Sequence, residues 1–268
     1  MNVIKKYTIF NSTVELHISN TIANKEKISR VFEQFSYDTG TCGLSTIKIQ
    51  ISDGQLTIQI AENEMIYKNV LSTDYYPILF SVIYDLARLK NYWGIHAAAV
   101  QKNDVVLVIC GDFGTGKSSL ALAFQDLGWR IISTDQTILS CNHDLCQFMM
   151  GTYFMKHKGK EYYLNSSFQL EPLVVTKLLC SMGMVDNGDV VIHNSVSNYK
   201  RILWNHFSWP WNTLINDYSS INAYKYKENI EHIIGFLNAI EIDVDVIRGD
   251  SRKIAEYYDE KFKLFFSL

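Results

Sequence analysis

The order of apolar and polar residues predicts mainly strands in the first seventy residues. Apolar and polar side chains alternate over 13–18, which is typical of a strand with one buried face. Alternation also runs through 46–61, where TIKIQIS and QLTIQIA stand on either side of Asp53-Gly54, a pair that favours a type I′ hairpin turn. Residues 25–35 carry apolar side chains at helical spacing instead. The pattern therefore predicts a small β-rich unit.

Beyond this unit, the pattern switches between helical and extended periods. Apolar positions predict a helix over 75–92, and the small residues of GIHAAAV at 94–100 suit close packing beside a central sheet. The short run at 104–110 is apolar and rich in β-branched residues, as a buried parallel strand is. The other expected elements are helices over 118–127, 227–240 and 251–262 (the last capped by Asp250 or Ser251), strands over 129–133, 173–182, 189–196 and 242–247, and a hairpin turn at Asn187-Gly188.

The residues between the run at 104–110 and the following helix carry a chemical motif. GDFGTGKSS fits G-x-x-x-x-G-K-[ST], the phosphate-binding loop, in which glycines let successive backbone N–H groups face one point. The helix N-terminus adds partial positive charge there, Lys117 is expected at the β- and γ-phosphates, and Ser118 on Mg²⁺. The alternative is a glycine-rich turn that holds a lysine by chance. The expected nucleotide contacts are Gly111, Asp112, Phe113, Gly114, Thr115, Gly116, Lys117, Ser118 and Ser119.

Two further side chains are candidates for chemistry beside this loop. Asp135 follows the apolar strand over 129–133, the usual place for a carboxylate that binds Mg²⁺ directly or through water. Alternatively, Asp135 simply begins a turn. His96 precedes the loop strand and either orients a reacting group or is a core histidine with satisfied hydrogen bonds.

Composition and charge narrow the partners and the compartment. A net charge of −3 gives no electrostatic reason to expect nucleic acid or an anionic membrane as partner. The N-terminus does not have the pattern of a signal peptide, and no apolar run approaches membrane-spanning length. Five cysteines without C-x-x-C pairs favour a reduced compartment, so a cytoplasmic location is expected. Cys141, His143 and Cys146 lack a second pair at zinc spacing, and a turn between two strands is preferred to a metal site.

The order IHAAAV, VVLVIC, GDFGTGKSSLALAF, LGWRIISTDQTIL resembles the HPr kinase/phosphorylase family and its compact kinase relatives. These proteins share a P-loop core with phosphoenolpyruvate carboxykinase. The resemblance covers about Gly94 to Leu139. It implies an α/β fold with a P-loop kinase core over 92–268, preceded by the β-rich N-terminal unit with its linking helix over 1–91. It also implies ATP and Mg²⁺ as cofactors.

Carried over residue by residue, the resemblance assigns His96, Lys117 and Asp135 as catalytic and Ser118 and Asp135 as metal ligands. His96 matches the family histidine near the reacting hydroxyl, and Asp135 matches the second of two aspartates. Thr134 stands where the family has its general-base aspartate, and threonine cannot accept an alcohol proton near neutral pH. Either Asp135 or His96 takes over as base, or the acceptor needs no strong base, or transfer activity has been lost.

Beyond Leu139 the resemblance fades. The glycine-rich signature of bifunctional family members has no counterpart, so phosphorolysis and HPr itself as acceptor are not expected. The aromatic segment YKRILWNHFSWPWN is interpreted as core or as a plug between elements, in preference to a ligand groove.

These features predict an ATP- and Mg²⁺-dependent kinase that phosphorylates a hydroxyl. The preferred acceptor is a serine or threonine of a peptide or protein, because compact relatives occur as tailoring kinases for ribosomally made peptides. The alternatives are a small-molecule kinase, a nucleotide-binding regulatory module without transfer activity, and an ATPase or GTPase. Neither nucleic acid nor membrane is expected as partner, and a homo-oligomer is left open.

Overall fold

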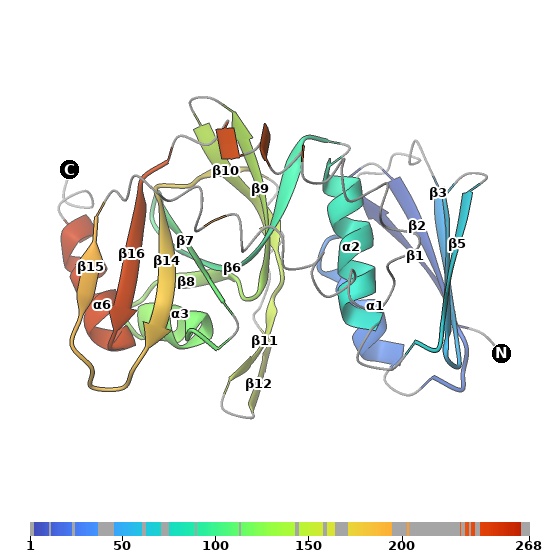
Figure 1. The fold of residues 1–268 in the computed structure, drawn as a ribbon, viewed down its shortest axis with the longest axis horizontal. Coiled ribbons are helices and arrows are strands. Elements are labelled where there is room, and N and C mark those ends of the chain that lie inside the picture. The colour runs from blue at the N-terminus through green and yellow to red at the C-terminus, as the bar shows by residue number, and fades with distance from the viewer. Residues whose placement is uncertain are drawn as a thin grey trace. The chain divides into compact units, whose positions relative to one another are not determined.

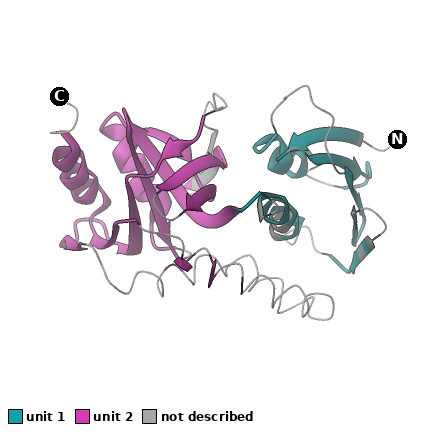
Figure 2. Ribbon diagram, turned by 90° about the horizontal axis from the view of Figure 1, so that it is seen from above, with its two compact units in different colours: residues 1–91, 210–229 teal, residues 92–209, 230–268 magenta. Residues whose placement is uncertain are grey.

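The computed structural model has a mixed α/β fold with two compact units (Figure 2). Unit 1 comprises residues 1–91 and 210–229, and unit 2 comprises residues 92–209 and 230–268. Among the described residues, no helix is long and apolar enough to cross a membrane. The structure describes residues 3–10, 12–22, 25–36, 46–60, 63–70, 75–88, 90–112, 114–142, 145–157, 160–163, 171–194, 203, 231, 234–235, 237–238 and 242–263.

Unit 1 contains a five-stranded sheet in the order β1-β2-β3-β4-β5 (Figure 1). Its pairs are antiparallel except for the parallel pair β2–β3. The alternation predicted at the sequence level is confirmed, since β2 and β3 each bury every second side chain. The elements are β1 (Val3–Ile9), β2 (Ser12–Ile18), α1 (Lys25–Glu33), β3 (Thr46–Ser52), β4 (Gln55–Ile60), β5 (Asn63–Lys68) and α2 (Tyr75–Arg88).

The turn between β3 and β4 is short, as expected, but its type differs from the prediction. Ser52 pairs with Gln55, so two residues connect the strands. Gly54 has a φ of 68°, whereas Asp53 is not among the residues with positive φ. A type I′ turn needs positive φ at both central positions, so that prediction is wrong. Glycine adopts this region without steric cost, and here it alone does so.

The sheet of unit 2 is built around the long strand β6 (Figure 1). β6 pairs antiparallel with β7, β8 and β9, so GIHAAAV forms the centre of the sheet itself and does not lie beside it. β7 pairs parallel with β14, and β14 pairs parallel with β16. The strands are β6 (Tyr92–Lys102), β7 (Val105–Gly111), β8 (Arg130–Ser133), β9 (Gln136–Asn142), β10 (Leu145–Gly151), β13 (Leu173–Val174), β14 (Lys177–Met184), β15 (Val191–His193) and β16 (Val244–Gly249), with β11 (Phe154–His157) and β12 (Lys160–Tyr163) forming a separate ribbon.

Two helices, α3 (Lys117–Asp126) and α6 (Ser251–Lys263), pack together over one face of this sheet. Their shared core includes Leu120 and Phe124 of α3 and Tyr258 of α6. Every residue of β7 is buried, which explains why its sequence is a continuous apolar run. The predicted cap of α6 is confirmed, because Asp250 Oδ1 accepts hydrogen bonds from the backbone N–H groups of its first turn.

The connection between β14 and β15 differs from the prediction. The hairpin predicted at Asn187-Gly188 is wrong, because β16 lies between β14 and β15 and pairs with both. The local turn signal is real but serves a crossover, and the Asn187 N–H donates to Asp250 Oδ2 at 2.7 Å. The aromatic segment 199–212 and the helix expected over 227–240 lie, apart from a few isolated positions, outside the described residues.

The number and spacing of the cysteines favour reduced thiols, but two of the cysteines form a disulfide. Cys141 and Cys146 face each other across β9 and β10 and form a disulfide. The two strands expected around the turn between these cysteines are confirmed, and their antiparallel register brings the two side chains together. Cys110 and Cys180, on neighbouring strands, are buried thiols with their sulfurs 3.2 Å apart. His143 lies outside the described residues.

Candidate active site

The glycine-rich segment between β7 and α3 forms a tight loop that is fixed on the end of β14. Thr115 donates to the Asp112 carbonyl through both its N–H, at 3.3 Å, and its hydroxyl, at 2.8 Å. The Thr115 carbonyl in turn accepts the Ser181 hydroxyl at 2.8 Å and the Met184 N–H at 3.0 Å. The described part of the loop is therefore hydrogen-bonded to the end of a neighbouring parallel strand.

Two motif glycines are required by close approach to β14. A Cβ on Gly111 would lie 2.5 Å from Thr115 Oγ1 and 2.7 Å from the Ser181 carbonyl oxygen. Gly116 has a φ of 85°, and a Cβ there would lie 2.5 Å from the Met184 side chain. Side chains at either position would displace the loop from the strand. Phe113, one of the predicted contacts, lies outside the described residues.

The N-terminus of α3 lacks the groups that normally satisfy a helix end. Its N-cap is Gly116 in the left-handed conformation without a side-chain capping hydrogen bond, and its first turn has no acidic residue. The first residues of the helix are instead Lys117, Ser118 and Ser119, of which the lysine opposes the helix dipole. This departure from ordinary helix design is explained if the N-terminus binds an anion.

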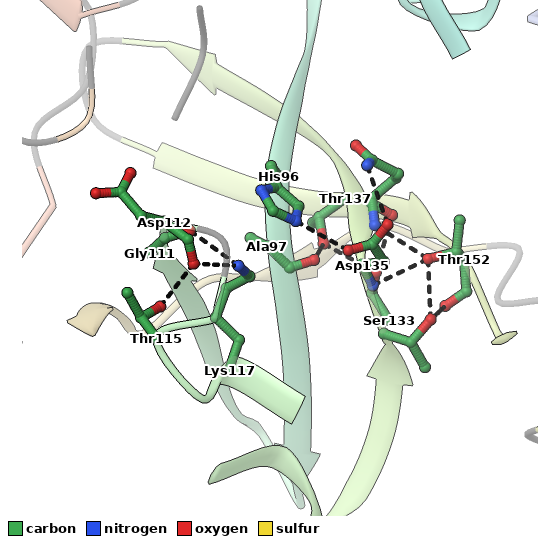
Figure 3. Close-up of polar contacts among 12 residues, drawn as sticks. His96, Ala97, Gly111, Asp112, Thr115, Lys117, Ser133, Asp135, Thr137 and Thr152 are labelled. Atoms are coloured by element: carbon green, nitrogen blue, oxygen red, sulfur yellow. Dashed lines mark hydrogen bonds and ion pairs between the residues drawn. The ribbon is translucent and has the colours of Figure 1, made fainter. Parts of the chain in front are cut away.

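Lys117 is buried, with 7% of its surface exposed, and its ammonium faces the loop (Figure 3). Its Nζ donates to the carbonyl oxygens of Gly111 at 2.9 Å and Asp112 at 3.1 Å. Burial lowers the pKa of Lys117, and attraction to Asp135 partly offsets this effect. The fold thus keeps a desolvated cation at the start of α3, where it strengthens any attraction to a phosphate.

His96 and Asp135 form a hydrogen-bonded pair beside the loop (Figure 3). The register of β6 with β7 pairs Ala97 with Cys110, so His96 lies next to Gly111. The His96 Nε2 is 2.9 Å from Asp135 Oδ1, with His96 only 3% exposed and the Asp135 side chain 36% exposed. A buried imidazole is thus hydrogen-bonded to a carboxylate that solvent can reach.

The surroundings of Asp135 favour its charged form. Burial alone would raise the pKa of the Asp135 carboxyl, but the hydrogen bond and charge of His96, together with the Lys117 ammonium, outweigh it. The Gln136 side-chain amide also donates to Asp135 Oδ2, at 3.2 Å. The pKa therefore lies below its ordinary value, and the site holds an anion opposite the Lys117 cation.

Thr134 does not share the surroundings of Asp135. Its side chain is buried and bonds to the carbonyl oxygens of Thr152 and Phe154, at the start of the ribbon. The threonine that replaces the expected base is therefore part of the structural support of the site. Thr152, Gln136 and Ser181 complete this support and were missed by sequence analysis, because nothing in their local sequence signals a contact with the loop or with Asp135.

The residues present are compatible with a magnesium ion. Mg²⁺ keeps most of its ligands as water and phosphate oxygens and needs only one or two from the protein. The Asp135 carboxylate and the half-buried Ser118 hydroxyl are oxygen ligands of this kind. A site made by three or more histidine, cysteine or acidic side chains is absent from the described residues, so a protein-only metal cage is not formed among them.

Comparison with known proteins assigns neither a family nor a function to this chain. No family model matches the chain, and no curated protein matches it. Among solved structures, the Hpr(Ser) kinase/phosphatase from Coxiella burnetii is similar to 35% of this chain, with 19% sequence identity and a TM-score of 0.28. The similar part spans 59% of that chain, less than two thirds of its length. A likeness this distant carries no argument about fold or function.

Proposed function

We propose that this chain is an ATP- and Mg²⁺-dependent phosphotransferase with a hydroxyl acceptor. The observation that carries the proposal is the uncapped N-terminus of α3, where a buried lysine and a fixed glycine loop adjoin the His96–Asp135 pair. Separately, each feature has a structural explanation. Together they supply positive charge for phosphates and a titratable pair for the acceptor, which are the two requirements of phosphoryl transfer.

Each group has a definite task in such a reaction. The α3 N–H groups and Lys117 bind the phosphates and neutralise the charge on the transferred group. Asp135 and Ser118 would hold Mg²⁺, which would neutralise further phosphate charge when bound. As the acceptor oxygen bonds to the γ-phosphorus and the bond to the β-phosphate oxygen breaks, the acceptor proton passes to the His96–Asp135 pair.

The proposed acceptor is a serine or threonine of a peptide or protein, and a small-molecule alcohol is the alternative. Solvent reaches Asp135, whereas His96 and Lys117 are buried, so an acceptor hydroxyl would approach from the Asp135 side. Asp135 is the preferred base for this reason, with His96 fixing its orientation.

Nucleotide binding is tested first, by titration calorimetry with ATP and Mg²⁺. Lys117→Ala removes the ammonium proposed to contact the phosphates and should weaken binding about tenfold to hundredfold. Lys261→Ala is the matched control, because it removes one exposed lysine from the last turn of α6 and should leave affinity unchanged. Absence of ATP binding by the wild type would refute the proposal.

Transfer is tested by intact-mass spectrometry with a pool of serine- and threonine-containing peptides and a second pool of small alcohols. A phosphate-sized mass gain on one acceptor, lost in Lys117→Ala and Asp135→Asn, supports the proposal. ATP binding without transfer to either pool would favour a regulatory nucleotide-binding module. Hydrolysis at equal rates with and without acceptors would favour an ATPase.

A further inference from the structure

Thr152 is the hub of a buried hydrogen-bond cluster behind Asp135 (Figure 3). It lies between β10 and β11 and is fully buried. Its hydroxyl oxygen accepts the backbone N–H groups of Asp135 and Gln136, each at 3.0 Å. The same oxygen lies 3.0 Å from the hydroxyl of Thr134. One side chain from the connection between β10 and β11 thus holds both peptide units that flank Asp135.

Counting donors and acceptors fixes the direction of every bond in the cluster. A hydroxyl has two acceptor positions and one proton, and both acceptor positions of Thr152 are used by backbone N–H groups. Its proton must therefore go to the Thr134 oxygen. The Thr134 proton then goes to a carbonyl, of which the Phe154 oxygen is nearest at 2.5 Å and the Thr152 oxygen follows at 3.0 Å. Both hydroxyls are satisfied only in this order.

We propose that Thr134 and Thr152 form a directed hydroxyl relay that fixes the main chain at Asp135 and so aims its carboxylate at His96. Both threonines are positioning residues, because neither hydroxyl bonds to the Asp135 carboxylate itself. The hydrogen bonds of the relay do not depend on what the protein does. Only the effect of the relay on catalysis rests on the proposed phosphotransferase function.

The relay explains why a threonine occupies the position of a base. Position 134 needs a group that accepts one hydrogen bond and donates another. An ionised aspartate accepts only, and its oxygens would be buried against the Phe154 and Thr152 carbonyls without a proton between them. The relay thus predicts that Thr134→Asp does not increase transfer.

The test compares three variants at one position. Thr134→Ser keeps the hydroxyl, Thr134→Val keeps the shape without it, and Thr134→Asp supplies the carboxylate. Thr134→Val should lower kcat about tenfold or more, while the KM for ATP stays nearly constant because the loop is untouched. Thr134→Ser should keep most of the wild-type rate. Thr176→Val is the control, because the hydroxyl of this exposed residue also accepts a backbone N–H, that of Val106, outside the site.

A second readout requires no activity. The His96 ring N–H that bonds to Asp135 should give a downfield, exchange-protected proton resonance, assigned by its loss in His96→Gln. The resonance should persist in Thr134→Ser and Thr176→Val and weaken in Thr134→Val. Thr152→Val should have the same effect as Thr134→Val, which provides a second variant if one fails to fold.

The two proposals fail in different ways. If the wild type transfers no phosphate but the resonance follows the hydroxyl series, the proposed function is wrong and the relay stands. If Thr134→Val keeps both the wild-type resonance and any wild-type turnover, the relay is overturned. Greater turnover in Thr134→Asp would also overturn it and would identify the position as that of a missing base.

Discussion

Asp135 and its neighbour Thr134 face opposite environments although they are adjacent in sequence. The Asp135 carboxylate meets His96 and Gln136 and remains partly exposed to solvent. The Thr134 hydroxyl is buried among carbonyl oxygens, where a charge would be costly. Of the two residues that directly follow β8, Thr134 has a buried hydroxyl and Asp135 has a partly exposed carboxylate.

The lowered pKa of Asp135 predicts an acid-dependent contribution to stability. In the unfolded chain its pKa is near the ordinary 3.8, and in the folded chain it is lower. The stabilisation is therefore complete above the unfolded value and is lost as pH falls through the folded value. Because the side chain is about one-third exposed, we expect a contribution of about 1 kcal/mol or less.

Urea unfolding of the wild type and Asp135→Asn between about pH 3 and pH 7 checks this expectation. The difference in unfolding free energy should be largest near neutral pH and should shrink in acid. Glu260→Gln is the control, since it removes an exposed carboxylate from α6. A difference that grows on acidification would show that the carboxylate is destabilised in the folded state.

The proximity of His96 and Asp135 could be predicted from sequence, and the roles of the candidate residues stay predictions. The residues that support them structurally could not be predicted. His96, Lys117 and Asp135 stand next to strong local patterns, namely an apolar strand or a glycine loop, and the structure brings His96 and Asp135 into contact. Thr152 and Ser181 reach the site only because β10 and β14 are placed beside it by the sheet. Their roles depend on long-range pairing, which leaves no pattern around them.

At the scale of elements, the site depends on the close passage of β10 behind β8. A Cβ on Gly151, the last residue of β10, would overlap the Ser133 side chain and lie 3.0 Å from the Gln136 carbonyl oxygen. The Ser133 hydroxyl already donates to that carbonyl at 2.9 Å and accepts from Thr137. The absence of a side chain at Gly151 therefore sets the spacing of the two segments that carry Asp135 and Thr152.

Gly151→Ala should separate these segments and damage both stability and the positioning of Asp135. Overpacking at a fully constrained contact costs about 1–3 kcal/mol, and the displaced Thr152 hydroxyl would no longer meet the Asp135 backbone. Urea unfolding measures the first effect and the His96 ring N–H resonance the second. Gly235→Ala is the control, because an added Cβ there meets nothing within 4 Å. Wild-type values for both readouts would contradict the proposed close passage.

The burial of a strand could be predicted from its own sequence, but its partner strands could not. The all-buried β7 and the alternating β3 were readable because their side-chain pattern reflects their own burial. The partners of a strand follow from the whole sheet, so the pairing of β15 with β16 was mistaken for a local hairpin. GIHAAAV was similarly placed beside the sheet because small residues indicate close packing without indicating with what.

At the scale of the whole molecule, every described residue of the candidate site belongs to unit 2. The loop, His96, Asp135 and Thr152 all lie within residues 92–209. The sheet of unit 1 has its own buried face, with Ile47, Ile49 and Ile51 among its core residues. Ligand binding at the candidate site should therefore stabilise unit 2 directly.

Hydrogen exchange with and without ATP and Mg²⁺ tests this assignment across the chain. A ligand at about 100 times its Kd stabilises the structure that binds it by about 2.7 kcal/mol, so exchange through opening of that structure should slow about a hundredfold. We expect protection in the loop at 111–119 and in the segments around His96 and Asp135. Peptides from β3 and β4 should exchange as before. In Lys117→Ala, whose affinity should be about tenfold to hundredfold lower, the same nucleotide concentration should slow exchange in unit 2 only about twofold to tenfold. Equal protection of β3 and β4 in the wild type would show that the nucleotide contacts or couples to unit 1, and the site as described would then be incomplete.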